Sequence, residues 1–389
     1  MNFSPLARQL TNLLDTAIRE AVFPGAVAGI SYGPPERRET LVLAQGSLQS
    51  DFFDAQNPST SYPAIFAPSG PITEQVFFDL ASLTKPFATL LSILCLRQAK
   101  KIRLADRLPD LLKMNISSPL AAITLAQLLG HCSGLAAYKP FYEKLCTIAQ
   151  EKRTQTLRAW LLQEKLLYPP GTKTVYSDLG YMFLSWIIEE QAGCPFDEYT
   201  RTQVLAPLGL ADHLFFNRLD SIRKVLYAPT EQCSWRTKTL TGEVHDDNCY
   251  ALGGVSGHAG LFGDMHGVLA MSAHLLDVWK GKTSHPNYTA ADLKKMTKRQ
   301  NIPGNTWALG FDTPSDSGSS AGRNMSDKSF GHLGFTGTSF WIDPESDLVM
   351  VLLTNRVHPS RENNLIKIFR PRFHDTITNW LLAQDRNTN

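Results

Sequence analysis

The sequence FFDLASLTKPFATLLSILCL, residues 77–96, places one lysine, Lys85, inside an apolar run, three residues after Ser82 and directly before a proline. Its apolar side chains recur at helical spacing, which predicts a buried helix over residues 83–97. Residues three apart share a helix face, so we expect the serine hydroxyl within reach of the lysine amine. A lysine desolvated by apolar walls helps to activate a serine, which makes Ser82 a candidate nucleophile. The alternative for this four-residue pattern alone is a lysine that extends its amine to water.

The length and charge of the chain favour a large fold that acts on a small molecule. It has 389 residues, of which 43% are hydrophobic, enough to bury a large core in one domain or in two intergrown lobes. Its 38 basic and 36 acidic residues leave a formal net charge of +2. A chain so close to neutral shows no excess of positive charge that would favour binding to nucleic acid, so we expect a small-molecule substrate. The oligomeric state stays open.

The amino-terminal segment, residues 1–25, lacks the continuous apolar stretch and the small-residue cleavage site of a signal peptide. The apolar run around residues 87–96 is much shorter than the roughly 20 residues that cross a bilayer. We therefore expect a cytoplasmic protein that makes no membrane contact. The six cysteines are scattered without a C-x-x-C pair, which predicts reduced and mostly buried thiols.

The order of the predicted elements indicates an α+β fold. Residues 25–33 and 40–47 form short apolar runs around a polar turn, which predicts a hairpin, and residues 338–355 predict two strands joined by a turn. Helical patterns dominate between them, and a last helix follows. We expect one domain over residues 1–389, in which both termini build an antiparallel sheet flanked by helices. The expected division is a sheet lobe at about 1–85 and 250–389, and a helical lobe at about 86–249.

Two segments of the sequence are predicted to form loops. Residues 51–73 are rich in Pro, Ser and Asp, which predicts a surface excursion. Residues 313–328 are rich in Ser and Gly and directly precede the segment SFGHLGFTG, so we expect a mobile loop that acts as a lid over a site. A groove between the lobes is the expected place for that site.

Two more motifs accompany Ser82 and Lys85. The segment VYSDLGYMFLSW places Tyr176 and Asp178 at the head of an apolar helix, and SFGHLGFTGTSFWID places His332 before a predicted strand. In this order and at these separations, the three motifs resemble the active-site elements of the serine β-lactamase and penicillin-binding-protein superfamily, in particular its class C β-lactamase-like branch. Segments such as ITLAQLLGHCSGL and LGGVSGHAGLFGDMHGV extend the resemblance over most of the chain.

The resemblance implies a catalytic role for several residues. Ser82 would attack a carbonyl and form an acyl-enzyme, while Lys85 and Tyr176 would handle the protons. The backbone N–H groups of Ser82 and Phe335 would form the oxyanion hole. The remaining residues expected to contact substrate are Asp178, His258, His332, Gly334, Thr336 and Arg356.

Two residues depart from the family pattern. Asp178 stands where many relatives have asparagine, and its negative charge would keep Lys85 in the ammonium form, which favours Tyr176 as the proton acceptor. The alternative is that Asp178 caps the following helix. His332 stands where relatives often have lysine, and we expect a neutral imidazole that donates one hydrogen bond.

A group of histidines and aspartates, His245, Asp246, Asp247 and His258, raises the possibility of zinc. No His-Glu-x-x-His or similar helical spacing is present, so we expect hydrogen bonding between loops, with no metal and no cofactor.

The segments VHDDNCYALGGVSGHAGLF and TNRVHPSREN resemble the branch that includes N-acetylmuramoyl-L-alanine amidases. This resemblance implies hydrolysis of an amide in a cell-wall muropeptide, in fragments recycled inside the cell. Arg356 would bind a carboxylate of the substrate or, alternatively, form a surface ion pair. The alternatives are a carboxylesterase, a D-alanyl-D-alanine peptidase or β-lactamase-like hydrolase, and a non-catalytic binding protein on the same fold.

Overall fold

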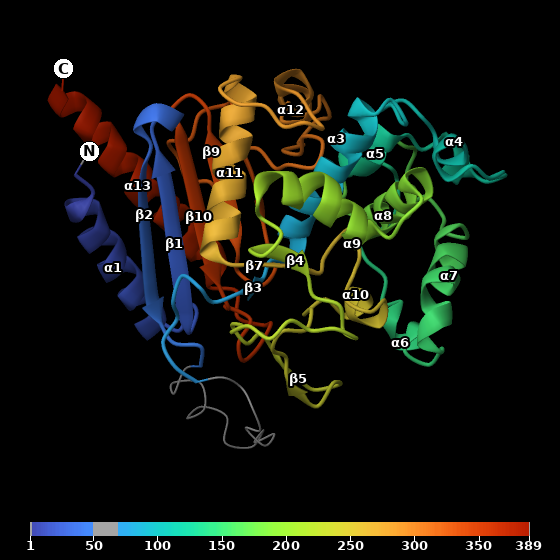
Figure 1. The fold of residues 1–389 in the computed structure, drawn as a ribbon, viewed down its shortest axis with the longest axis horizontal. Helices are drawn as coiled ribbons and strands as arrows, with labels where there is room; N and C mark the ends of the chain where they lie inside the picture. Colours follow the sequence, from blue (N-terminus) through green and yellow to red (C-terminus); the bar gives the residue numbers. More distant parts are fainter. Residues whose placement is uncertain (1, 50–68, 389) are drawn as a thin grey trace.

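Both ends of the chain build one antiparallel sheet, which confirms the predicted α+β class. The computed structural model describes residues 2–49 and 69–388, so the excursion expected over residues 51–73 lies almost wholly outside the described residues. The main sheet has five strands in the order β2-β1-β10-β9-β8 (Figure 1). These strands are β1 Gly25–Tyr32, β2 Glu39–Gly46, β8 Phe330–Leu333, β9 Ser339–Asp343 and β10 Leu348–Thr354.

The predicted strand pairs are confirmed, whereas β8, which contains His332 and pairs with β9, was not predicted. β1 and β2 form the expected hairpin, with Gly25 opposite Gly46, and β9 and β10 form the second expected pair. β1 also pairs with β10, with Ala26 opposite Thr354, and this pairing joins the two ends of the chain.

Helices cover both faces of the main sheet, which explains why β1 is buried along nearly its whole length. α1 (Ser4–Arg19) and α13 (Ile366–Thr388) lie on one face, where their apolar side chains share a core with residues such as Trp341 (Figure 1). α11 (Met265–Lys280) covers the opposite face, and its side chains join the larger core that continues into the helical part of the molecule.

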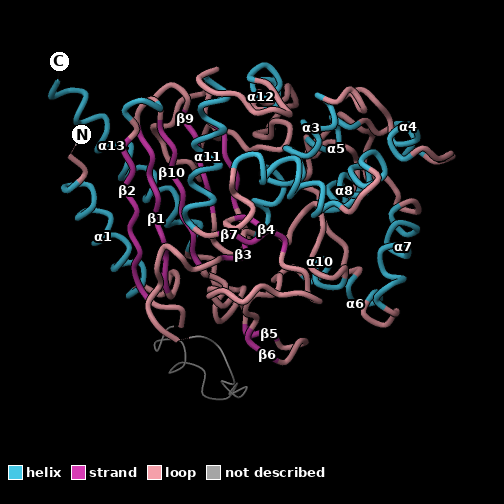
Figure 2. The backbone as a smooth tube through the Cα atoms, in the orientation of Figure 1, coloured by secondary structure: helices cyan, strands magenta, loops and turns pink. Residues whose placement is uncertain are grey.

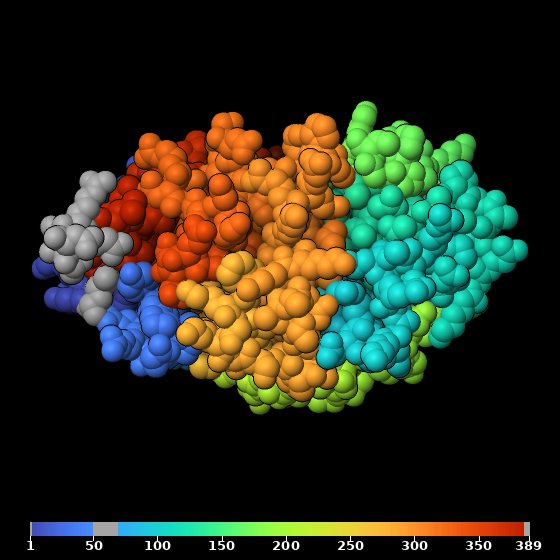
Figure 3. Space-filling model, turned by 90° about the horizontal axis from the view of Figure 1, so that it is seen from above, coloured from blue at the N-terminus to red at the C-terminus, as the bar shows by residue number. Residues whose placement is uncertain are grey.

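Short helices fill the middle of the chain beside the sheet (Figure 2). The longest is α8 (Asp178–Ala192), which is apolar and mostly buried. The others are α3 Leu91–Gln98, α4 Leu108–Leu112, α5 Leu125–Leu129, α6 Tyr142–Leu145, α7 Gln150–Leu161, α9 Phe196–Thr200, α10 Asp247–Ala251 and α12 Ala290–Met296. In Figure 3 the cyan surface of residues in this part abuts the orange surface of later segments. The division of the chain near residues 86 and 249 stays a prediction.

A small sheet brings distant segments of the chain together next to the Ser82 turn. β3 (Phe78–Asp79) pairs with β7 (Leu261–Gly263), and β7 pairs with β4 (Leu214–Phe216). The short strands β5 Gln232–Cys233 and β6 Lys238–Thr239 form a separate pair. The residues before β7 therefore lie beside those that follow β3.

The quoted stretch does not form the single α-helix expected over residues 83–97. The chain makes a 3-10 turn at Ala81–Leu83 and a π-helical turn at Lys85–Leu90 before α3 begins. Pro86 explains the difference, because it has no N–H to bond the carbonyl of Ser82, one α-helical turn back. Irregular turns of this kind often occur at functional sites.

Residues 313–328 do not form the expected lid, because they lie away from the cavity. The segment is tied to α13: Nε of Arg323 donates to Asp375 at 2.9 Å, and Nδ1 of His374 donates to the carbonyl of Ser320 at 2.8 Å. None of residues 313–328 lines the cavity described below. The segment packs against the sheet side of the molecule, and the sequence pattern alone could not show this.

The cysteines are free thiols, and four of the six are buried. None of the helices in the described parts of the chain combines the length and the apolar character that crossing a bilayer requires.

Candidate active site

Ser82 lies in a turn whose backbone is held in an unusual conformation. Ala81, directly before it, has φ +48°, a left-handed value that costs a non-glycine residue roughly 1–2 kcal/mol. The buried carboxyl of Asp79 holds this conformation, because Oδ1 accepts from the N–H of Ala81 at 2.8 Å and Oδ2 accepts from the N–H of His245 at 2.6 Å. Burial raises the pKa of Asp79 despite these two bonds. The arrangement places Ser82 on the wall of a cavity.

Lys85 is fully buried and donates from its ammonium group to three acceptors. Nζ lies 3.1 Å from Oγ of Ser82, 2.8 Å from Oδ1 of Asp178 and 3.2 Å from the carbonyl oxygen of His258. Burial is the largest single influence and lowers the pKa of Lys85, but the charges of Asp178 and Tyr176 and the hydrogen bonds to both groups together outweigh it, so the pKa is raised above its ordinary value. Lys85 is therefore an ammonium ion at neutral pH, with no lone pair to accept the serine proton.

Asp178 pairs with Lys85 and does not cap the helix that it begins. The cap of α8 is Ser177, whose Oγ accepts from the N–H of Gly180 at 3.2 Å. The alternative that Asp178 is the cap is therefore wrong. In the first turn of α8 its carboxylate also lies at the positive end of the helix dipole.

Tyr176 packs against Lys85 in an aromatic pocket. Nζ of Lys85 lies 4.6 Å from the centroid of the Tyr176 ring, and the rings of His131 and Trp307 lie 4.5 Å and 4.9 Å from it. Burial is the largest influence on the pKa of Tyr176 and raises it. The charge of Lys85 lowers this pKa and the charge of Asp178 raises it, and the net result is a pKa above the ordinary value. The phenol therefore keeps its proton at neutral pH.

His332 is a neutral side chain at the end of β8. Nδ1 lies 2.9 Å from the carbonyl oxygen of Leu333, and because a carbonyl only accepts, Nδ1 carries the proton. Burial and the charge of Lys85 lower the pKa of His332 to about 3. Nε2 is therefore an acceptor, and it is buried without a partner among the described residues. The prediction of a neutral imidazole that donates one hydrogen bond therefore needs one correction. The N–H donates to the backbone carbonyl of Leu333, and the nitrogen without a hydrogen, Nε2, can only accept.

The turn after β8 brings the backbone of Phe335 to the cavity. Gly334 permits a close approach, since a Cβ there would lie 2.0 Å from Oγ1 of Thr338 and 2.7 Å from the carbonyl of Leu80. Gly337 has φ +112°, which only glycine adopts without strain. No acceptor in the described parts of the chain is recorded for the N–H of Phe335, which remains the predicted oxyanion-hole donor.

The ring of Phe335 is 50% exposed and lies between two polar side chains. The imidazole of His245 stacks on it with centroids 5.6 Å apart, and the guanidinium carbon of Arg356 lies 4.4 Å from its centroid. The guanidinium of Arg356 is attracted to the face of the ring, and the imidazole of His245 packs against the ring as well, so both neighbours hold the ring and with it the backbone of the turn.

Thr336 does not contact the cavity, contrary to the expectation of a substrate contact. Its side chain is buried, and Oγ1 donates to the carbonyl of Asp79 at 2.7 Å. Thr336 therefore faces the interior of the fold, whereas its neighbour in the turn, Phe335, lines the cavity. The hydroxyl ties this turn to the turn that carries Ser82.

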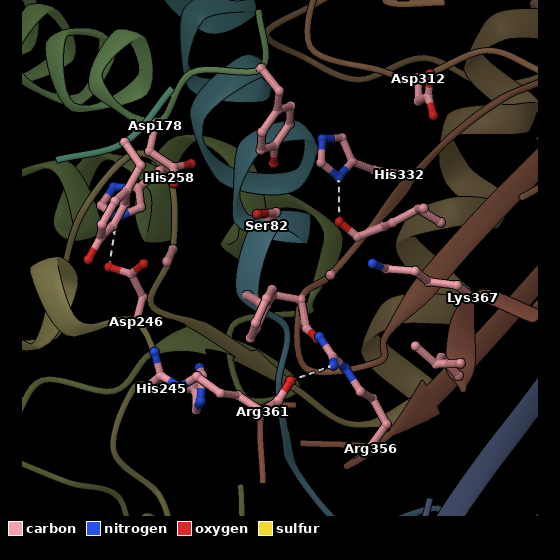
Figure 4. A pocket seen from close by; sticks show the side chains of 18 of the residues that line it. Ser82, Asp178, His245, Asp246, His258, Asp312, His332, Arg356, Arg361 and Lys367 are labelled. Carbon is pink, nitrogen blue, oxygen red and sulfur yellow. Dashed lines mark hydrogen bonds and ion pairs between the residues drawn. The ribbon is translucent and has the colours of Figure 1, made fainter. Parts of the chain in front are cut away.

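Asp246 and His258 form a hydrogen-bonded pair on the side of the cavity where Asp178 lies (Figure 4). Nε2 of His258 lies 2.8 Å from Oδ1 of Asp246, and Nδ1 lies 2.9 Å from Oγ of Ser256. Burial opposes ionisation of Asp246, but the charge of His258 and its hydrogen bond hold the pKa of Asp246 well below its usual range. His258 therefore acts through its contacts: its ring fixes Asp246 and its carbonyl accepts from Lys85.

His245 and Asp247 belong to an ion-pair network. Nε2 of His245 lies 3.1 Å from Glu231, and Asp247 accepts from Arg236 at 2.6 Å and from Arg361 at 3.3 Å. This agrees with the expected hydrogen bonding between loops. Within the described residues, no group of three His, Cys, Asp or Glu side chains has the geometry of a metal site.

Arg356 is buried and donates mainly to backbone carbonyls. Nε donates to Phe335 at 2.7 Å, and Nη1 donates to Arg361 at 3.0 Å and also to Asn363. It is not the surface ion pair that the sequence left open, since it is buried and holds the loop after β10 against the Phe335 turn.

These groups surround one cavity of about 540 Å³ between the sheet and the helical part (Figure 4). Most of the predicted site residues line it, whereas Lys85 lies buried behind its wall and Thr336 faces away. The predicted residues on the wall are Ser82, Tyr176, Asp178, His258, His332, Gly334, Phe335 and Arg356.

The comparisons with known proteins agree with this geometry. A family model described as Beta-lactamase matches residues 14–370. The chain belongs to the beta-lactamase family. It is 34% identical over 312 residues to the N-acetylmuramyl-L-alanine amidase of Bacillus subtilis (strain 168), covering 73% of this chain and 69% of that one. It is 30% identical over 308 residues to a putative D-alanyl-D-alanine carboxypeptidase of Escherichia coli (strain K12), covering 74% and 70%.

Two solved structures share the fold. EstCE1, a hydrolase with promiscuous acyltransferase activity, matches with a TM-score of 0.71 and 20% identity over 96% of this chain and 98% of its own. A class C beta-lactamase from Rhodobacter sphaeroides matches with a TM-score of 0.66 and 19% identity over 95% and 98%. The protein is a serine hydrolase of the beta-lactamase family.

Sequence reasoning missed several residues that shape the site. Asp79 is a single acidic residue in the same apolar stretch that singled out Lys85, and the same signal could have identified it. His131, Trp307 and Arg370 carry no comparable signal, because only the fold brings them to the cavity and to the ring of Tyr176.

Proposed function

We propose that this serine hydrolase cleaves the amide bond between an N-acetylmuramoyl group and L-alanine in cell-wall fragments, through an acyl-enzyme on Ser82. The amidase named among its relatives supports this reading. The putative carboxypeptidase among the relatives is the competing substrate class, and the chemistry of the site is needed to choose between them.

The observation that carries the choice is the neutral His332 beside Ser82 and Tyr176. A carboxypeptidase substrate bears a carboxylate on the leaving residue itself, and so does a β-lactam near its cleaved bond. His332 offers such a group no positive charge, since its one N–H already donates to Leu333 and its pKa is lowered to about 3. An amide in the interior of a chain needs no cation at this position, which favours the amidase.

The chemistry proposed for acylation follows from the charges of Lys85 and Tyr176. Because Lys85 is an ammonium ion and Tyr176 is a protonated phenol, the phenol oxygen would accept the proton of Ser82 as its own proton passes to the leaving nitrogen. Oγ bonds the carbonyl carbon, the C–N bond breaks, and the amine leaves neutral. Lys85 would stabilise the negative charge that develops on the oxygens, and the N–H groups of Ser82 and Phe335 would bind the carbonyl oxygen.

Deacylation would use the same phenol in the reverse direction. Water attacks the ester carbon, its proton passes to the oxygen of Tyr176, and the phenol proton passes to Oγ of Ser82 as the ester bond breaks. The products are a muramic acid with a free lactyl carboxyl and the regenerated enzyme. In heavy-oxygen water, the label therefore enters the lactyl carboxyl.

Mass spectrometry of muropeptide digests tests the proposal. We expect free N-acetylmuramic acid and intact peptide from N-acetylmuramoyl-L-alanyl peptides, and much slower release of D-alanine from peptides that end in D-alanyl-D-alanine. Release of D-alanine without muramic acid would identify a carboxypeptidase. Hydrolysis of p-nitrophenyl acetate that far exceeds both would identify an esterase, for which the apolar Leu333, Phe335 and Ile366 on the cavity wall would form the acyl pocket.

A further inference from the structure

Three cations gather on the wall of the cavity that α13 and the loop after β10 provide: Arg356, Lys367 and Arg370. Within residues 2–49 and 69–388, none of the three has a recorded ion pair with a carboxylate. Arg361 nearby is different, because it is paired with Glu231 and Asp247. The charge of Glu362 raises the pKa of Arg356 without forming an ion pair with it, so the described part of the protein neutralises the positive charge of this wall only in part.

Two of these cations are buried, with exposed fractions of 4% for Arg356 and 5% for Arg370. Nη2 of Arg370 donates to the carbonyls of Gly334 and Thr338 at 2.8 Å each, while its Nε is buried and has no partner among the described residues. Burial and the charge of Arg356 lower the pKa of Arg370 to about 9, and burial lowers that of Arg356 to about 10. Buried charges are normally paired with an opposite charge, so two unpaired guanidinium groups create a strong local preference for an anion.

Lys367 gives this wall an accessible contact. It is exposed in the first turn of α13, lines the cavity, and has no recorded side-chain hydrogen bond or ion pair in the described parts of the chain. Figure 4 shows its amine directed into the cavity, on the side of Arg356 and opposite Asp246. Its ammonium can bind a ligand without breaking an existing pair.

We propose that Arg356, Lys367 and Arg370 form a carboxylate subsite, in which Lys367 contacts the substrate directly and the two buried guanidinium groups supply the attractive field. This inference rests on the proposed amidase function. A muramoyl group carries no ionised group once its lactyl carboxyl is in amide linkage, so the carboxylate belongs to the peptide that leaves. The alanine carboxyl is itself in amide linkage in a longer peptide, so the carboxylate lies one residue or more beyond the scissile bond. The substrate class is an N-acyl-alanyl peptide whose next residue is acidic.

The preference of the enzyme for a substrate with free carboxylates over the same substrate with amidated carboxylates tests the subsite. We compare kcat/KM for N-acetylmuramoyl-L-alanyl-D-glutamate with that for its diamide, in the wild type and in Lys367→Gln. A hydrogen bond to a charged group predicts that the wild type prefers the acid by about tenfold or more, and that the preference falls to a few-fold in the variant. Arg372→Gln removes an exposed cation of the same helix outside the cavity and should keep the wild-type ratio.

A second measurement works even if no amide is cleaved. L-alanyl-D-glutamate, the leaving peptide, should slow the labelling of wild-type Ser82 by a fluorophosphonate at much lower concentration than its diamide does, and Lys367→Gln should remove the difference. Equal protection by acid and diamide in the wild type would overturn the subsite. Acid-selective protection without cleavage of either muramoyl substrate would overturn the amidase proposal and keep the subsite.

Discussion

The two opposite walls of the cavity differ in how their charges are compensated. On the wall beside the helical part, each charge has a partner: Lys85 pairs with Asp178 at 2.8 Å, and His258 bonds Asp246 at the same distance. On the wall beside α13, Lys367 and the two buried arginines have no recorded carboxylate partner among the described residues.

The difference separates groups that must keep a fixed position from groups that meet a ligand. A paired and buried ammonium keeps both its charge and its place, which suits chemistry at Ser82. A cation that has no carboxylate partner in the protein can still form an ion pair with an anionic ligand. Substitutions on the first wall should therefore change kcat, and substitutions on the second wall should change the discrimination between substrates.

Replacing Ser82 should have the largest effect. Ser82→Ala removes the proposed nucleophile, so labelling by a fluorophosphonate and hydrolysis of every substrate should both disappear. Ser256→Ala is the matched control, because Ser256 bonds a histidine that bonds an aspartate, which resembles a second nucleophile site. Mass spectrometry of the labelled peptide decides between them, and labelling that survives in Ser82→Ala would contradict the assignment.

Tyr176→Phe should have the next largest effect, because it removes the hydroxyl that handles the proton and keeps the ring against His131 and Trp307. We expect kcat to fall by about 10²-fold or more, the usual scale of general acid–base catalysis, with little change in KM. Tyr181→Phe is the control, since its hydroxyl donates to the Leu129 carbonyl at 3.1 Å and does not line the cavity. Its kcat should change by only a few-fold, at a stability cost of about 1 kcal/mol. A similar loss of kcat in both variants would mean that the effect is structural.

The sequence predicted the pairings of the sheet well, because alternation and turn residues are local signals. It also predicted that Ser82, Lys85 and Tyr176 lie together, because the family resemblance carries their order along the chain. It could not predict that Pro86 converts an α-helix into a π-helical turn, or that Thr336 faces away, because both depend on backbone geometry. The sequence also did not predict the group of cations beside α13. Lys367 and Arg370 have the pattern of ordinary helix-surface residues, and only the packing of the helix against the cavity shows their position.

Asp178→Asn tests whether the first wall needs its pairing. The charge of Asp178 raises the pKa of Lys85, so its removal should lower that pKa and move the alkaline limb of the kcat/KM profile to lower pH. We expect about a tenfold loss of kcat/KM at pH 8, the order of magnitude of one lost charge–charge contact at a site. The control is Asp292→Asn, which removes a pair with Arg97 at 3.0 Å outside the cavity. If activity instead rises in Asp178→Asn, a deprotonated Lys85 is the base and the proposed proton path is wrong.

His332→Gln should have the smallest effect on turnover, because the imidazole is neutral and a glutamine also provides an uncharged acceptor. Its pKa in the fold is about 3, below the ordinary value of about 6.5, so the wild type loses stability as pH falls from 6.5 towards 3. The glutamine variant should lack this loss, which amounts to about 3 kcal/mol between pH 6.5 and pH 4. Urea unfolding at the two pH values measures it, with the exposed His266→Gln as control. A kcat/KM that rises steeply below pH 6.5 in the wild type and is flat in His332→Gln would show that a charged imidazole binds the substrate. The cation would then lie next to the scissile bond, and the contrast between the two walls would fail.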